Sequence, residues 1–499
     1  MSWENLKKPW MPWAVFGGAL VAVLLLGLLA ASIMERRSEA LIAYKPLHPV
    51  KPFEPRNEIW GKNFPREYES YMKTREIAGD SGEDQLAKDP RMVILWAGYG
   101  FSREYNKPKG HAYAIDDIRR ILRTGAPKDA NDGPQPNTCW TCKSPDVPRM
   151  MKEMGVAEFY KGKWASLGHE IVNPIGCGDC HDPKTMDLMI TRPALIEAFQ
   201  RQGKDITKAT HQEKRSLVCA QCHVEYYFKK DGNYLTFPQD KGTTVEDMEK
   251  YYDEYNFSDW THAISKAPML KAQHPDYEVW QLGIHAKRGL SCADCHMPYV
   301  SEGGVKFTDH HVKSPLRMIN RTCQVCHRQS EEELKRNVTE RQQKNQELRL
   351  MAEETLVKAH FDAKAAWDKG ATEEMMKPAL KLIRQAQWRW DYAAAGHGNS
   401  FHAPLEIARI FANSSEKANL ARFELAKIHQ KLGVESVIYP DISTKEKAQK
   451  LVGIDLQKLR ADKEGFLNTL VKEWDEKAKV RNEAWDKEYE KGMCDPSVK

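Results

Sequence analysis

The chain has 499 residues, which is enough for two or three domains, and 41% of them are hydrophobic. Its 75 basic and 70 acidic residues are interspersed and leave a formal charge of only +5, which argues against a general nucleic-acid binder. The 26 prolines and 30 glycines predict much irregular chain and a thin conventional core, which a bulky apolar cofactor would complete.

An apolar segment lies at the N-terminus. The run from Ala14 to Met34 has 21 residues without a charge, and a membrane span needs roughly 20. Trp10 and Trp13 precede it, where amphipathic rings favour the membrane interface. A signal peptide usually has a shorter apolar region, of about 7–15 residues, although small residues near the end of this run would suit cleavage. We therefore predict that residues 1–37 are a membrane anchor or a signal segment, and both alternatives export the rest of the chain.

The remaining chain is predicted to be mainly helical. Residues 38–90 form a proline-containing, extended lead-in, and short helices and turns follow with few strand patterns. No proline occurs between Pro315 and Pro378, so the segment 330–367 predicts one long helix. A second long helix is predicted from Pro404 to Gly433, and 443–492 is a further charged helical stretch.

Ten of the eleven cysteines form five C-x-x-C pairs. Four pairs are followed at once by histidine, which is the pattern of covalent c-type haem attachment. They are Cys177 and Cys180 with His181, Cys219 and Cys222 with His223, Cys292 and Cys295 with His296, and Cys323 and Cys326 with His327. A structural zinc site commonly uses two such pairs for one metal, so five pairs would leave one pair without a partner. Disulfides within the five pairs would close only short loops and would constrain the chain very little. The pattern predicts c-type haems, and Cys494 is left without a role.

The fifth pair, Cys139 and Cys142, is followed by Lys143. A neutral lysine amine can bind iron, because the charge of the metal offsets the reference pKa of about 10.4. A different axial ligand at one haem of five predicts a different task for that haem, namely catalysis with an open position for substrate. The alternative is that Lys143 is a drifted histidine or that this pair binds no haem.

The four other haems each need a second strong ligand if they carry electrons. After the motif histidines, 13 of the 17 histidines remain. The candidates with suitable local sequence are His111, His285, His310 or His311, and His402. The residues expected to be ordinary hydrogen-bonded or surface side chains are His48, His169, His211, His262, His360 and His429.

A small anionic substrate at the open haem would need fixed positive charge and proton donors. Arg123 lies shortly before the lysine motif, Tyr226 follows the third motif, and His274 precedes the fourth. Each of the three is a weak candidate alone, because a surface ion pair or a packed aromatic ring would explain it equally well.

Together, the motifs resemble those of pentahaem cytochrome c nitrite reductase, the ammonia-forming enzyme. C-x-x-C-K comes first and four C-x-x-C-H motifs follow, with LRTGAP at 122–127, HVEYY at 223–227 and KAQHPD at 271–276. The match runs from about residue 90 to about residue 405.

The resemblance implies site residues one by one. The haem at Lys143 would be the active site, with Arg123, Tyr226 and His274 on its open side. The distal histidines would be His311 for the second motif, with the adjacent His310 left open, His111 for the third, His402 for the fourth and His285 for the fifth. Calcium would lie beside the active haem, bound by Glu225, the carbonyls of Tyr226 and Lys271, and Gln273, an oxygen set that this cation prefers. Without the resemblance, that turn would be a plain polar loop.

The resemblance also implies fold and function. We expect a mainly α multihaem cytochrome c with a pentahaem catalytic region at 38–330 and long helices at 331–499 that pack together and form a homodimer. The expected activity is the periplasmic six-electron reduction of nitrite to ammonium, fed by a membrane quinol-oxidising multihaem cytochrome. Two alternatives stay open: a multihaem reductase of hydroxylamine, sulfite or tetrathionate, and a membrane-anchored electron-transfer cytochrome.

Overall fold

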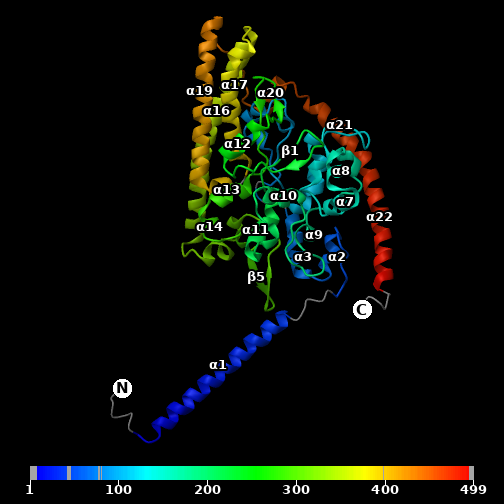
Figure 1. Ribbon diagram of the computed structural model, residues 1–499, viewed down its shortest axis with the longest axis vertical. Coiled ribbons are helices and arrows are strands. Elements are labelled where there is room, and N and C mark those ends of the chain that lie inside the picture. The colour runs from blue at the N-terminus through cyan, green and yellow to red at the C-terminus, as the bar shows by residue number, and fades with distance from the viewer. Residues whose placement is uncertain (1–7, 42–46, 77–78, 80, 397, 494–499) are drawn as a thin grey trace. The chain divides into compact units, whose positions relative to one another are not determined.

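The computed structural model describes residues 8–41, 47–76, 79, 81–396 and 398–493 (Figure 1). It divides into two compact units, residues 1–50 and 51–499. The predicted mainly α class is confirmed, because strands within the described ranges form only short two-stranded sheets. Cys494 lies outside the described residues.

The first unit contains the helix α1 (Met11–Leu41). Its segment Met11–Glu35 has 25 residues with a mean hydropathy of 2.6. At about 1.5 Å per residue this segment is about 37 Å long, which exceeds a hydrocarbon core of about 30 Å. The helix is therefore long and apolar enough to cross a membrane, and a signal sequence would have the same properties.

The haem motifs lie in a region of short elements, because glycine, proline and turn residues interrupt the helices repeatedly. Its α-helices are α2 (Asn57–Gly61), α3 (Pro65–Met72), α4 (Gln85–Lys88), α5 (Arg91–Leu95), α6 (Ala114–Arg120), α7 (Asp146–Met154), α8 (Val156–Lys161), α9 (Cys177–Cys180), α10 (Pro193–Arg201), α11 (His211–Ala220), α12 (Val245–Glu254), α13 (Asp276–Leu282), α14 (Ile284–Lys287) and α15 (Cys292–His296). The antiparallel strand pairs are β1 (Tyr227–Phe228) with β2 (Leu235–Thr236), β3 (Trp260–Thr261) with β4 (Pro268–Met269), and β5 (Tyr299–Glu302) with β6 (Val305–Thr308).

Three long helices, α16 (Glu331–Asp368), α17 (Glu373–Ala395) and α19 (Pro404–Leu432), pack side by side (Figure 1). The side chain of Ser330 caps α16 by accepting a hydrogen bond from the amide of Glu333. Proline opens α19, and the left-handed Gly433 ends it. Both long helices predicted at 330–367 and from Pro404 to Gly433 are therefore present, and the short α18 (Asn399–His402) precedes α19.

Two features of the C-terminal half differ from the sequence-based expectation. The helix α17 was not predicted, because Pro378 lies inside it and ended the helical pattern. The stretch 443–492 is divided into α20 (Lys445–Leu451), α21 (Leu456–Asn468) and α22 (Leu470–Met493). Gly453, with φ of 75°, follows the first of these helices and makes the turn that separates it from the second.

The second unit has two hydrophobic clusters. One joins α5 and α12 to the three long helices, with Trp388 and Trp390 fully buried. The other surrounds the lysine motif, where the rings of Trp140 and Trp164 stack at 4.8 Å and Trp474 of α22 lies 5.6 Å from Trp164. The C-terminal helices therefore contribute directly to the support of the first haem motif, and residues 51–499 form one unit. The predicted functional division at residue 330 stays a prediction.

A buried histidine pair ties the β3–β4 turn to α16. The rings of His262 and His360 stack with centres 3.7 Å apart. His262 Nε2 donates to the Ile94 carbonyl at 2.8 Å, and its Nδ1 accepts from the Ser265 amide at 3.2 Å. His360 Nε2 donates to Gln387 Oε1 at 2.8 Å. Each ring is thus bonded in its neutral form.

This pair predicts a loss of stability in acid. Burial lowers the pKa of His360 to about 4 and that of His262 well below its usual value, whereas an unfolded histidine titrates near 6.5. The pair therefore stabilises the fold fully above about pH 6.5, and this contribution falls as the pH drops towards 4, by up to about 3 kcal/mol for His360. Melting curves from pH 7 to pH 4 should show a smaller acid-induced fall for His360→Gln than for the wild type. Parallel curves would contradict this assignment.

Candidate active site

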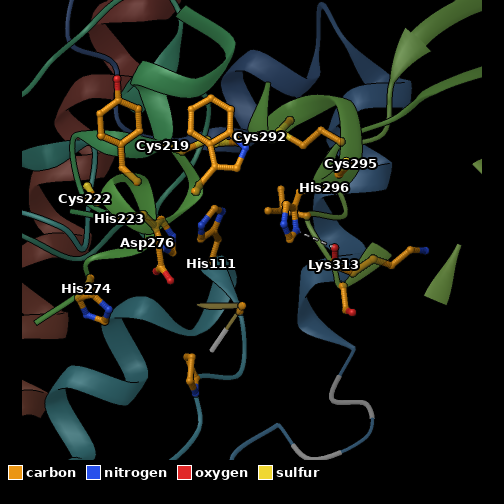
Figure 2. Close-up of a pocket in the computed structure, with 18 of the residues that line it drawn as sticks. His111, Cys219, Cys222, His223, His274, Asp276, Cys292, Cys295, His296 and Lys313 are labelled. Atoms are coloured by element: carbon orange, nitrogen blue, oxygen red, sulfur yellow. Dashed lines mark hydrogen bonds and ion pairs between the residues drawn. The ribbon is translucent and has the colours of Figure 1, made fainter. Parts of the chain in front are cut away.

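The five cysteine motifs surround one cavity of about 3260 Å³ in the second unit. A fifth of this volume is about 650 Å³, which is within the ~300–1,000 Å³ of a typical ligand pocket. All ten motif cysteines, Lys143 and the four motif histidines line it, and Figure 2 shows the third and fourth motifs at its wall. The cavity therefore has room for five large groups, each next to its own motif.

Contacts between motifs fix their order in space. Cys142 lies close enough to Cys222 for each cysteine to shift the pKa of the other, which places the lysine motif beside the third motif. Cys219 and Cys292 are near each other in the same way, which places the third motif beside the fourth. Cys323 of the fifth motif lies close enough to Cys295 of the fourth to raise its pKa, after burial as the main cause. The spatial order is therefore first, third, fourth and fifth.

Three histidine pairs have a spacing that suits a metal ion between them. Two imidazoles bound to opposite sides of one iron, each through a nitrogen about 2 Å away, have ring centres roughly 6 Å apart. The observed ring-centre distances are 6.3 Å for His181 and His310, 6.4 Å for His296 and His402, and 6.3 Å for His327 and His285. The chain is therefore spaced to hold a haem iron at each of these three motifs.

Hydrogen bonds at the other ring nitrogen leave Nε2 available to a metal. His181 Nδ1 donates to the Met186 carbonyl at 2.8 Å, and His310 Nδ1 donates to the Thr308 carbonyl at 2.7 Å. His296 Nδ1 donates to the Lys313 carbonyl at 3.2 Å (Figure 2). Histidines that bind metals almost always donate their second ring N–H in this way, which fixes the tautomer.

The structure places His310, and not the predicted His311, opposite His181. His311 is buried, with its Nδ1 3.2 Å from the Lys313 ammonium and its amide bonded to Asp309 Oδ1. Val312, the next residue, has φ of 43°, a left-handed conformation that makes a tight turn here. His310 therefore has the better geometry of the two adjacent candidates, and the choice between His310 and His311 as ligand of the second motif stays a prediction.

The third motif has a different environment. His223 Nδ1 donates to Asp276 Oδ2 at 3.1 Å, so its second bond is to a carboxylate rather than to a carbonyl. His274, two residues before Asp276, has its ring centre 6.2 Å from that of His223. Asp276, two residues after His274, already bonds Nδ1 of His223. We therefore assign the contact between the His223 and His274 rings to side-by-side packing. His111 lies near enough to both His223 and Lys143 for their charges to lower its pKa, which burial brings to about 4.

Local structure holds the lysine motif firmly. A 3₁₀ turn at Asn137–Trp140 carries Cys139, and the amide of Lys143 donates to the Trp140 carbonyl at 2.9 Å. The indole of Trp140 donates to the Trp164 carbonyl at 2.9 Å. Lys143 lines the cavity, as the four motif histidines do.

Arg123, Tyr226 and His274 all line the same cavity as Lys143. The Arg123 guanidinium lies 3.9 Å from the centre of the Phe101 ring, and its Nη1 is buried without a hydrogen-bond partner among the described residues. A buried, unpaired guanidinium nitrogen is costly unless an anion satisfies it. Burial raises the pKa of Tyr226 well above its usual value, so its hydroxyl stays a proton donor.

The four predicted calcium ligands lie together beside this site. Glu225 is fully buried, and its Oε2 accepts from the Gln273 amide at 2.6 Å. Gln273 Nε2 is 3.5 Å from the Lys271 carbonyl, and Tyr226 adjoins Glu225 in the chain. Burial, and then the neighbouring carboxylate of Glu278, raises the pKa of Glu225 well above its usual value. A cation would offset the buried negative charge of Glu225, so these four residues fit a calcium ion.

The sequence did not indicate three carboxyl groups near the site, of which Glu278 is buried and Asp259 and Asp276 are half-buried. Burial raises the pKa values of Glu278 and Asp259 to about 7, and Glu278 Oε2 has no hydrogen-bond partner among the described residues. Asp276, the third, bonds His223. Two of these, Asp276 and Glu278, follow His274 in HPDYE, so an acidic pair beside a candidate histidine was the available indication.

Comparisons with known proteins agree on one family. The family model for cytochrome c552 matches residues 56–484. The cytochrome c-552 of Parabacteroides distasonis is 61% identical over 487 residues, covering 96% of this chain and 99% of that protein. The cytochrome c-552 of Bacteroides thetaiotaomicron is 60% identical over 485 residues, covering 96% and 98%. A solved cytochrome c nitrite reductase from Desulfovibrio desulfuricans, a catalytic subunit described with two calcium sites, has a TM-score of 0.72 and 33% identity over 82% of this chain and 91% of its own.

Proposed function

The chain belongs to the cytochrome c552 family, and we propose that it reduces nitrite to ammonium at a c-type haem bound by Cys139, Cys142 and Lys143. The observation that carries this proposal is the cavity in which one lysine motif, with Arg123 and Tyr226 beside it, meets four histidine motifs. The reaction takes up six electrons and eight protons and yields one ammonium ion and two water molecules for each nitrite.

Five c-type haems fit the chain, and calcium fits beside the first. We propose that the haems of the four histidine motifs would be held by His181 and His310, by His223 and His111, by His296 and His402, and by His327 and His285. When bound, the haems would supply an electron relay, and the haem at Lys143 would supply the iron at which nitrite is reduced. The spatial order of the motifs supports a route through the fifth, fourth and third motifs to the lysine motif.

The chain's own residues bind the anion and supply protons. The Arg123 guanidinium has a free donor for a nitrite oxygen and carries a fixed positive charge. The Tyr226 hydroxyl, held protonated by burial, donates a hydrogen bond at the same side. His274 lies next to Asp276, whose carboxylate stabilises positive charge on it, and so it is suited to transfer protons.

A direct assay tests the proposal. The purified holoprotein, reduced with a viologen dye, should consume six electrons per nitrite and release one ammonium ion. Ammonium from hydroxylamine but not from nitrite, or turnover of sulfite or tetrathionate alone, would favour the alternative reductases. No turnover of any of them would favour an electron-transfer cytochrome.

The calcium group gives a second test. Glu225→Gln removes the one charged ligand of the proposed set, and we expect calcium affinity to fall by at least ~10-fold. Treatment with a chelator should lower nitrite turnover, and added calcium should restore it. The calcium concentration needed to restore turnover should be higher for the variant than for the wild type. Glu254→Gln, an exposed partner of Lys241, is the control. Equal calcium titrations for both variants would remove Glu225 from the site.

Location, donor and assembly belong to the proposal as well. The apolar α1 supports export with either retention as an anchor or cleavage, which would place the enzyme on the periplasmic side, near a membrane quinol-oxidising multihaem cytochrome. Exposed apolar side chains on α16 and α19, such as Met351 and Phe423, support a homodimer through the long helices. Mass spectrometry of the mature protein decides the anchor, because loss of about 32 residues would rule it out.

A further inference from the structure

A fully buried arginine clamps the main chain on both sides of the lysine ligand. Arg192, which directly precedes α10, is 1% exposed and lines the cavity. Its Nε donates to the Thr141 carbonyl at 2.7 Å, and its Nη2 donates to the Ser144 carbonyl at 2.9 Å. These two residues enclose Cys142 and Lys143 in the chain. One guanidinium therefore fixes both ends of the peptide segment from which the lysine side chain projects.

The same guanidinium joins two haem motifs. Arg192 Nη2 also donates to Asp179 Oδ1 at 2.5 Å, and Asp179 lies between the cysteines of the second motif. Asp179 in turn accepts from the Gly176 amide at 2.9 Å, which fixes the start of that motif. The lysine motif is thus held against the second motif through a paired buried charge rather than by packing alone.

A second arginine offers a comparison within the chain. Arg215, 6% exposed, donates at 3.0 Å to Asp294, which has the same place in the fourth motif as Asp179 has in the second. Its other bonds go to side chains, the hydroxyl groups of Ser291 and Tyr299. Arg215 thus supports a motif whose axial ligand is histidine, whereas Arg192 holds carbonyls around an axial lysine.

Lysine has more need of such support than histidine. Its ammonium group ends a flexible four-carbon stem, whereas an imidazole is rigid and its second nitrogen can be bonded in place, as at His181 and His296. An amine nitrogen has no second ring atom to orient it. Its position at the iron therefore depends on the main chain from which it starts, and a displacement of about 1 Å in an active site can cost ~100-fold in rate.

We propose that Arg192 is a positioning residue, which holds the Thr141–Ser144 segment so that the Lys143 amine reaches the iron of the active haem. The inference rests on the proposed function, because it assumes lysine ligation at that haem. It assigns to Arg192 a task that no histidine motif requires.

Matched substitutions test the assignment. Arg192→Lys and Arg215→Lys each keep a buried positive charge, but lysine lacks the fork that bonds several acceptors at once. We expect both holoproteins to carry five haems per chain. In Arg192→Lys the high-spin electron paramagnetic resonance signal of the active haem should change shape, and kcat should fall by ~10- to 100-fold with KM altered less than about 3-fold. Arg215→Lys should keep the wild-type high-spin signal of the active haem.

A double variant covers the case in which Arg192→Lys does not mature. Arg192→Met with Asp179→Asn removes both charges, so neither is left buried and unpaired, and it should show the same altered signal. The assignment is overturned if the mature Arg192 variant keeps the wild-type signal and kcat, or if Arg215→Lys changes the signal equally. A wild-type protein without a nitrite-sensitive high-spin signal would instead refute the proposed function, so the two failures are distinguishable.

Discussion

Arg123→Ala is expected to lower kcat/KM for nitrite by ~100-fold or more, since loss of one positioned donor to a developing anionic charge typically costs 10²–10³. The substitution removes a buried guanidinium whose Nη1 has no hydrogen-bond partner among the described residues, so few internal bonds are lost. All five haems should remain attached. Steady-state nitrite consumption by the reduced holoprotein, together with the haem-to-protein ratio, measures both expectations.

A matched control lies three residues away. Arg120 is on the exposed side of α6, where it pairs with Asp116 at 2.6 Å. Arg120→Ala should leave nitrite turnover within about 2-fold of the wild type, because exposed ion pairs contribute little. If Arg123→Ala also kept wild-type turnover, Arg123 would have no part in nitrite binding, and the reason for its unpaired nitrogen would have to be sought elsewhere.

Lys143→His is expected to have the second large effect. The substitution converts the first motif to C-x-x-C-H, so covalent haem attachment should continue. The axial nitrogen would then come from a shorter, rigid side chain on a segment that Arg192 and the Trp140 contact hold in place for lysine. Because axial-ligand identity controls the iron, we expect kcat for nitrite to fall by at least ~10-fold, with a changed spectrum for one haem of five.

The exposed Lys152 of α7 provides the control for this substitution. Lys152→His adds an imidazole nine residues beyond Lys143 in the chain, on a residue that does not line the cavity, and it should leave kcat and the spectrum unchanged. Full activity in Lys143→His would show that histidine serves equally well at this position. The lysine would then be a neutral replacement, and the catalytic haem would have to be identified by other means.

Features that depend only on residues adjacent in the chain could be predicted from the sequence. The motifs from Cys139 to His327 need only adjacent residues, and the helix α16 needs only a long segment without glycine or proline. The choice between His310 and His311 was different. Which of the two adjacent side chains faces His181 depends on the turn at Val312 and on the bond from the His310 amide to Ser70 Oγ of α3, which is distant in sequence.

Long-range contacts account for what could not be predicted. Arg192 contacts Thr141 and Ser144 from about fifty residues away, and no spacing rule joins them. The helix α17 contains Pro378, which tertiary packing against α16 and α19 tolerates. Likewise, the raised pKa of Glu278 results from burial among groups distant in sequence. Such features follow from the folded arrangement rather than from any segment alone.

The electron paramagnetic resonance spectrum of the oxidised wild-type protein, recorded with and without nitrite, tests the central claim most directly. One haem in five should be high-spin, with an open position, and nitrite should change its signal while the four histidine-ligated haems remain low-spin. A spectrum with only low-spin haem, unaffected by nitrite, would contradict the account, because the lysine-bound iron would then have no place for the substrate.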